Sequence, residues 1–135
     1  MTRRKTRQVL PLTALLAVCA GACGSDNLVQ PVNGRPVILS LTAFPSAIGP
    51  TDSAIVVCDA MDPDADSLLY DWITDSRLTI KGARPGDHSL YSTRGSSRVF
   101  YRGTVVPVSD TAFVQCMVRD DRGGVDGRIV LIILR

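Results

Sequence analysis

Glutamate is absent from this 135-residue chain, and lysine, histidine and tryptophan are scarce. All 13 acidic residues are aspartate, His88 is the only histidine, and Trp72 is the only tryptophan. The lack of glutamate and the scarcity of lysine remove two good helix formers and argue against helices. A single histidine leaves little material for a nucleophile–base catalytic pair, so an enzyme is not expected.

The chain also lacks an apolar run long enough to span a membrane as a mature helix. Its apolar stretch, Val9 to Ala22, follows four basic residues, an arrangement typical of a signal peptide over residues 1–22. The end of that stretch, Ala20-Gly21-Ala22-Cys23, resembles the lipobox of bacterial lipoproteins. The resemblance implies lipidation of Cys23 and a membrane anchor in the bacterial cell envelope. The alternative is an ordinary secretory signal and a soluble product.

The excess of basic residues belongs to this leader. Without residues 1–22 the chain has 11 basic and 13 acidic residues, a net charge of −2. We therefore expect no nucleic-acid partner. Gly24 and Ser25 follow Cys23, and the absence of an aspartate immediately after the cysteine favours the outer membrane in a host that has one.

The rest of the chain divides into a polar tether, residues 23–34, and a domain, residues 35–135. In the domain, short β-branched runs alternate with Pro, Gly, Asp and Ser, which is typical of an all-β sandwich. The strands are expected at Val37–Phe44, Ala54–Ala60, Leu68–Thr74, Leu78–Ile80, Arg98–Tyr101, Thr111–Arg119 and Arg128–Leu134.

Three residues of the domain are spaced as in immunoglobulin domains. Trp72 follows Cys58 by 14 residues, and Cys116 follows Cys58 by 58. The segment Asp110-Thr111-Ala112-Phe113-Val114-Gln115-Cys116 resembles the immunoglobulin segment before the second cysteine, with valine where that family has its corner tyrosine. The resemblance implies an immunoglobulin-like two-sheet sandwich of about seven strands, with a Cys58–Cys116 disulfide packed against Trp72. The alternative is two buried free thiols.

A second resemblance covers two turns of the domain. The stretch from Asp59 to Trp72 is similar to bacterial PKD-like and cadherin-like modules, which carry an Asp-Pro-Asp-Gly-Asp turn before a Leu-x-Tyr-x-Trp strand. The stretch from Val118 to Gly124 is similar to their closing Gly-Gly turn. Such modules mostly space, dock or bind, so the resemblance implies a non-enzymatic role.

A period of two tests the cysteine and tryptophan positions. If Cys58, Trp72 and Cys116 face the core, their apolar neighbours at alternate positions also face it. These neighbours are Val56, Ala60, Leu68, Tyr70, Ala112, Val114 and Val118. The same period turns Asp71 outward, and all three strands agree with one buried core.

Two polar segments offer binding chemistry. Asp62, Asp64 and Asp66 alternate as calcium ligands often do, and Asp120 or Asp121 is a further candidate, although the loop lacks the glycine and glutamate of an EF-hand. The alternative is a turn whose aspartates cap backbone amides. The basic stretch from Lys81 to Arg98, with Tyr91, is a candidate for an anionic glycan or an acidic partner; the alternative is a solvated loop containing one short strand.

The contiguous residues Asp87-His88-Ser89 do not predict a catalytic triad, because neighbouring side chains of an extended segment point to opposite faces. The outward positions of the core strands are more informative. The period of two places four apolar residues there, namely Leu69, Ile73, Phe113 and Met117, and the last strand, Ile129 to Leu134, is apolar on both faces. An exposed apolar face typically marks an interface. We therefore expect an envelope lipoprotein module that binds a protein partner through this face, with no cofactor, or alternatively a module for calcium or an anionic glycan.

Overall fold

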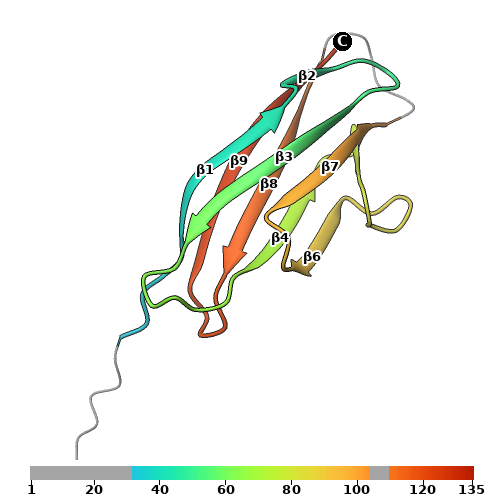
Figure 1. Ribbon diagram of the computed structural model, residues 1–135. Coiled ribbons are helices and arrows are strands. Elements are labelled where there is room, and N and C mark those ends of the chain that lie inside the picture. Colours follow the sequence, from blue (N-terminus) through green and yellow to red (C-terminus); the bar gives the residue numbers. More distant parts are fainter. Residues whose placement is uncertain (1–31, 104–109) are drawn as a thin grey trace, which may run out of the picture. The chain divides into compact units, whose positions relative to one another are not determined.

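The computed structural model describes residues 32–103 and 110–135, and all statements about the fold concern these residues. The predicted signal peptide, Cys23 with its predicted lipidation, and most of the tether lie outside them. The described chain contains nine strands and no helix (Figure 1). The strands are β1 (Val37–Phe44), β2 (Ala47–Ile48), β3 (Ser53–Met61), β4 (Leu69–Thr74), β5 (Leu78–Ile80), β6 (Ser89–Thr93), β7 (Ser97–Arg102), β8 (Asp110–Arg119) and β9 (Val125–Leu134).

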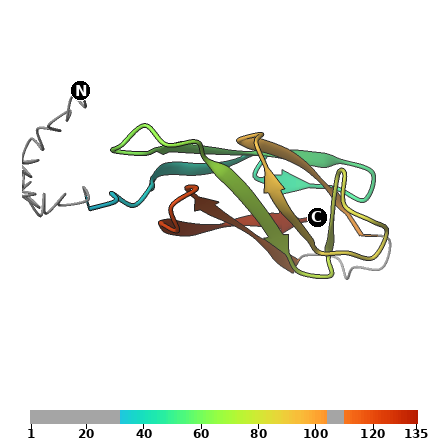
Figure 2. The ribbon, with the colours of Figure 1, turned by 90° about the horizontal axis from the view of Figure 1, so that it is seen from below.

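The strands form two sheets. One sheet has four strands in the order β1-β3-β7-β5, and the other has five in the order β2-β9-β8-β4-β6. Figure 2, from below, shows the strands of the two sheets as separate layers. All paired neighbours are antiparallel except β2, which runs parallel to the end of β9. The all-β two-sheet sandwich predicted from the sequence is confirmed.

Alternating burial explains why these segments form strands. In β8 the residues at even-numbered positions, Ala112, Val114, Cys116 and Val118, are buried, and their neighbours are not. The same alternation buries Ala54, Val56 and Cys58 in β3. Burying one side of each sheet against the other removes apolar surface from water, which is the main stabilising contribution to such a fold.

Trp72 lies at the centre of this core and is fully buried. It is the register partner of Cys116 on β8, and its ring meets the Phe100 ring edge-to-face, with centroids 6.0 Å apart and planes at 60°. Phe100 belongs to β7 in the opposite sheet. The two rings therefore join the sheets, in a geometry that aromatic pairs favour.

One strand, β2, was not predicted, and it is only two residues long. β6 lies inside the basic stretch and agrees with the alternative of a loop containing one short strand, whose bounds were not predicted. β6 is an edge strand beside β4 and contains one half-buried apolar residue, Leu90. A short edge strand of this composition carries almost no hydrophobic alternation, which is why the sequence did not give its bounds.

The end of the predicted tether contacts the domain. The Asn33 side-chain amide donates to Asp120 Oδ2 at 2.8 Å, and the Gly34 N–H donates to Asp64 Oδ2 at 2.7 Å. Asp64 lies in the β3–β4 turn and Asp120 in the β8–β9 turn, at the end of the sandwich where the described chain begins (Figure 1). The ordered domain therefore begins slightly before Arg35.

Candidate functional site

The two core cysteines face each other across the sandwich. Cys58 is on β3 and Cys116 on β8, and both are buried. The Cys116 thiol donates a hydrogen bond to Cys58, which lowers the pKa of Cys58 despite its burial. The same hydrogen bond, together with burial, raises the pKa of Cys116.

The predicted disulfide is not formed in the structure, where both residues are free thiols. The fold makes the two thiols neighbours in the core, but it does not bring them to disulfide distance. The fold alone does not oxidise the thiols, because forming the disulfide removes two electrons and two protons. The bridge therefore remains a prediction, while the burial of Cys58, Cys116 and Trp72 agrees with the sequence analysis.

The four residues predicted to form a partner-binding face are all half-buried. They lie on the outer side of β4 and β8, as the period of two required. Their register places Leu69 opposite Arg119 and Ile73 opposite Gln115. Phe113 and Met117 have their other neighbours on β9, opposite Leu131 and Gly127 respectively.

An ion pair between a buried carboxylate and a partly exposed arginine interrupts the face between these residues. Asp71 points outward as predicted, but it is only 3% exposed. Its carboxylate lies 2.7 Å from Arg119 Nε and accepts a 2.6 Å hydrogen bond from the Ser92 N–H of β6. Because Asp71 is also the register partner of Met117, it separates Leu69 from the apolar residues further along the sheet.

The exposed part of the apolar face is instead on β9. Ile129 is 60% exposed, Leu131 58% and Ile133 47%, whereas Ile132 and Leu134 are buried. Phe113 lies directly opposite Leu131 and joins this row to β8. We call Ile129, Leu131, Ile133 and Phe113 the β9 face.

The aspartates of the β3–β4 turn form a compact cluster. Asp62, Asp64 and Asp66 each contribute one carboxylate oxygen to a group whose members lie within 4.8 Å of one another. Asp62 Oδ1 also accepts hydrogen bonds from the backbone N–H groups of Asp64 at 2.8 Å and Asp66 at 3.2 Å. The structure thus contains both the turn capping and the carboxylate grouping that the sequence left as alternatives.

Electrostatics make this turn unfavourable for a negative charge. Burial raises the pKa of Asp66, and nearby carboxylates, including Asp62 and Asp64, raise it further, against the lowering effect of Arg122. Arg122 Nη2 lies 3.2 Å from Asp66 Oδ1. Two solvent-inaccessible oxygens, Asp62 Oδ2 and Asp66 Oδ2, have no hydrogen-bond partner among the described residues. A hard cation with oxygen ligands would relieve both the repulsion and the missing contacts.

Asp120 and Asp121 are not members of the three-carboxylate group that the described residues form. Asp120 is buried and its oxygens are already occupied. Asp120 Oδ1 accepts from the N–H groups of Arg122 and Gly124, and Oδ2 accepts from Asn33. Burial by itself raises the pKa of Asp120, but the hydrogen bonds together outweigh burial and lower this pKa. Asp120 therefore holds the β8–β9 turn in shape.

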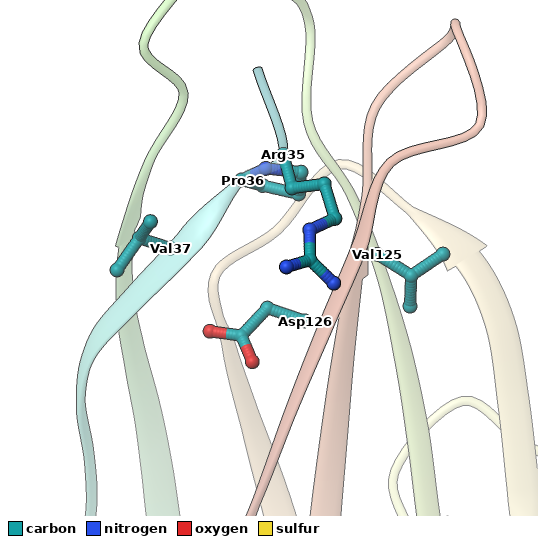
Figure 3. Close-up of a pocket in the computed structure, with 5 residues that line it drawn as sticks. All are labelled: Arg35, Pro36, Val37, Val125 and Asp126. Carbon is teal, nitrogen blue, oxygen red and sulfur yellow. The ribbon is translucent and has the colours of Figure 1, made fainter. Parts of the chain in front are cut away.

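A hollow of about 400 Å³ lies where β1 and β9 begin and is lined by Arg35, Pro36, Val37, Val125 and Asp126. Figure 3 shows the Arg35 side chain extending toward the Asp126 carboxylate, with Val37 and Val125 on either side. Asp126 Oδ2 accepts a 2.7 Å hydrogen bond from the Ile38 N–H. Since the Asp126 carboxylate links β1 to β9, we interpret this hollow as a structural junction between the two strands and not as a binding site.

The basic stretch is divided among several elements. Lys81 follows β5, Arg84 is in the next turn, Arg94 follows β6, and Arg98 is in β7. A second hollow, of about 340 Å³, is lined by Lys81, Arg98, Ile55, Ser97 and Val99. Tyr91 on β6 is not among its lining residues, so the predicted grouping of Tyr91 with the basic residues is not what the structure assembles there.

The segment Asp87-His88-Ser89 does not form a catalytic arrangement within the described residues. His88 Nδ1 lies 3.3 Å from the Leu78 carbonyl oxygen, and the His88 carbonyl accepts from the Thr74 N–H. Ser89 pairs with Ile73 in the sheet. These contacts give His88 and Ser89 structural roles.

Comparison with known proteins supports the fold. No protein-family model matches the chain, and no curated protein sequence is significantly similar to it. A solved structure of a nucleoside hydrolase-related hypothetical protein from Saccharophagus degradans, associated with carbohydrate metabolism, matches 76% of this chain at 15% identity, with a TM-score of 0.56. This chain covers 26% of that one, so the likeness shows a shared β-sandwich and no enzymatic function.

Within residues 32–103 and 110–135, no helix has the length and apolar character needed to cross a bilayer.

Proposed function

We propose that this chain is a non-enzymatic, lipid-anchored module of the bacterial cell envelope that binds a protein partner through the β9 face. The observation that carries the proposal is the row Ile129, Leu131 and Ile133, exposed side by side with Phe113 on a regular sheet. Burying such a row against a partner would remove apolar surface from water at about 25 cal/mol per Å².

The envelope location rests on the leader. A basic segment, an apolar stretch and the lipobox-like sequence before Cys23 favour export and lipidation. The oxidising conditions outside the cytoplasm also suit the buried pair Cys58 and Cys116, for which we propose a disulfide in the mature protein. The PKD-like character of the domain belongs to the same proposal.

In-cell crosslinking followed by pull-down of the tagged full-length chain tests the docking role. We expect a discrete protein partner that is lost in Leu131→Asp and in Phe113→Asp. The matched control is Ile55→Asp, because Ile55 is a similarly exposed apolar residue on the opposite sheet. Circular dichroism verifies that each variant is folded.

The outcomes separate clearly. Loss of the partner in Leu131→Asp but not in Ile55→Asp supports the β9 face. A partner that survives both substitutions on the β9 face, or that is lost equally in the control, contradicts it. Recovery of no specific partner from cells in which the lipidated protein is abundant also contradicts docking.

A second candidate is calcium binding by Asp62, Asp64 and Asp66. The observation that favours it is the pair of solvent-inaccessible, unpartnered oxygens on Asp62 and Asp66 beside a third carboxylate. The Arg122 guanidinium already lies against Asp66, so a cation has to displace it or share the site.

Thermal unfolding of the full-length chain with and without calcium chloride tests this candidate. Preferential binding to the folded state raises the melting temperature in proportion to the logarithm of the free calcium concentration above Kd. We expect the rise to disappear in Asp66→Asn and to persist in the control Asp87→Asn, which removes one exposed carboxylate outside the cluster. An unchanged melting temperature in millimolar calcium excludes the site.

A further inference from the structure

The hollow beside Lys81 lies on the outer side of the four-stranded sheet, whereas the β9 face belongs to the five-stranded sheet. Ile55 on β3 and Val99 on β7 are register partners and form its apolar part. Lys81, Ser97 and Arg98 complete the lining. Its volume, about 340 Å³, is comparable with the smaller small-molecule sites, which begin at roughly 300 Å³.

The charge of this hollow is positive. Both ionisable residues that line it are basic, and no carboxylate belongs to its lining. Neither Lys81 nor Arg98 forms an ion pair within the part of the chain that the structure describes. An anionic group placed here gains two cations whose charges are not already compensated by an ion pair.

The two basic residues are held to different extents. The Lys81 backbone N–H donates to the Val99 carbonyl at 2.9 Å, which places its Cα at the edge of β7. Arg98 Nη1 donates to the Ser97 carbonyl at 2.9 Å. The same nitrogen packs against Gly95, where an added Cβ would lie 2.8 Å from it. Anchoring reduces the conformational entropy lost when a ligand binds.

The surrounding face carries an aromatic ring and hydroxyl groups. Tyr101 follows Val99 on the same side of β7, is 40% exposed, and has Ser53 and Thr79 as its register partners. Ser97 lies on the hollow itself. A sugar ring has an apolar C–H face, which packs on aromatic and aliphatic side chains, and a rim of hydroxyls that exchange hydrogen bonds with serine and threonine.

We infer that this hollow, the Lys81 hollow, binds an acidic saccharide, with its carboxylate at Lys81 and Arg98 and its ring over Ile55, Val99 and Tyr101. Two cations suit one carboxylate. A nucleic-acid strand needs a longer series of cations, and the net charge of −2 outside the leader disfavours it. The inference is independent of the docking role, because Leu131 and Phe113 lie on the other sheet.

Isothermal titration of the full-length protein with trigalacturonic acid, compared with its methyl ester, tests the inference. We expect the acid to bind and the neutral ester to bind at least about tenfold more weakly, the value of one charge-assisted hydrogen bond. Lys81→Gln should weaken binding of the acid by about the same factor, and Lys81→Arg should restore part of it. Tyr101→Ala should weaken both ligands alike.

The control is Arg84→Gln, which removes the same charge from an exposed turn that does not line the hollow. Equal weakening by Arg84→Gln and Lys81→Gln would show general attraction to anions and overturn the site. The inference is also overturned if the acid does not bind at millimolar concentration, or if phosphatidylglycerol vesicles bind at Lys81 more tightly than the saccharide. Leu131→Asp should leave saccharide binding unchanged, so failure of the docking proposal leaves this result interpretable.

Discussion

Oxidation of Cys58 and Cys116 should change the stability of the domain more than any single surface substitution. The bridge closes a loop of 58 residues. In the chain-entropy description this removes about 14 cal/mol/K from the unfolded state, which corresponds to about 4 kcal/mol at 25 °C. The two buried thiols are not at disulfide distance in the structure, so any native-state distortion needed to close the bond is subtracted from this value. Four kcal/mol is a large fraction of the roughly 5–15 kcal/mol that stabilises a typical domain.

Urea unfolding followed by the fluorescence of Trp72 measures the effect, because Trp72 is the only tryptophan and pairs with Cys116 in the sheet. With a denaturant slope of about 1 kcal/mol/M, oxidised protein should unfold at about 3–4 M higher urea than reduced protein. Cys58→Ala should show no dependence on reductant. If mass spectrometry shows complete oxidation while the urea midpoint is unchanged, the entropic reasoning is refuted. If both thiols remain alkylatable after treatment with an oxidant, the proposed pairing itself is wrong.

Three further predictions concern polar contacts in the described structure. Arg119→Ala leaves the Asp71 carboxylate buried without its counter-charge and should cost about 2–4 kcal/mol in urea unfolding, whereas Asp71→Asn, which retains an acceptor, should cost less. Arg77 lowers the pKa of Asp110 through a hydrogen bond, so that contact stabilises the fold above the ordinary carboxyl pKa and is lost as the pH falls through the lowered value. The cost of Arg77→Gln should therefore shrink as the pH falls below the ordinary carboxyl pKa in acid titrations of stability. Gly124→Ala places a Cβ against a carboxylate oxygen of the β8–β9 turn and 2.9 Å from a proline ring, and it should lower the melting temperature by several degrees.

The interior of the sandwich could be predicted because burial has a period in the sequence. Cys58, Trp72 and Cys116 were each placed inward by their apolar neighbours at alternate positions, and all three are buried. The expected bounds of β1 and β5 coincide with the observed strands. A one-residue shift in any of these strands would have exposed its whole apolar set, so the pattern leaves one solution.

The outer surface was less predictable, because no single period governs it. The period of two correctly predicted that Asp71 points outward. It contained no information on Ser92 of the neighbouring strand β6, whose backbone N–H donates a hydrogen bond to the Asp71 carboxylate. Likewise, the spacing of Asp62, Asp64 and Asp66 suggested a cation site, and only the structure shows that Arg122 reaches this turn from another one. Contacts of this kind depend on the register between strands that are distant in the sequence.

The same argument explains why the two sheets are expected to differ in function. Inward positions are constrained by a shared core, so both sheets present similar aliphatic and aromatic residues there. Outward positions are free of that constraint. The β9 face has an aliphatic row around Leu131, while the opposite sheet places Tyr101 and exposed aliphatic residues such as Ile55 beside Lys81 and Arg98, which form no ion pair among the described residues. An exposed apolar row costs solubility unless a partner covers it. Two cations that line one hollow repel each other, and an anion bound there relieves that repulsion. Each outer face therefore has an unfavourable contribution to the free energy that binding would remove. For the β9 face it is exposed apolar surface, which a protein partner would cover, and for the Lys81 hollow it is charge repulsion, which an anion would relieve.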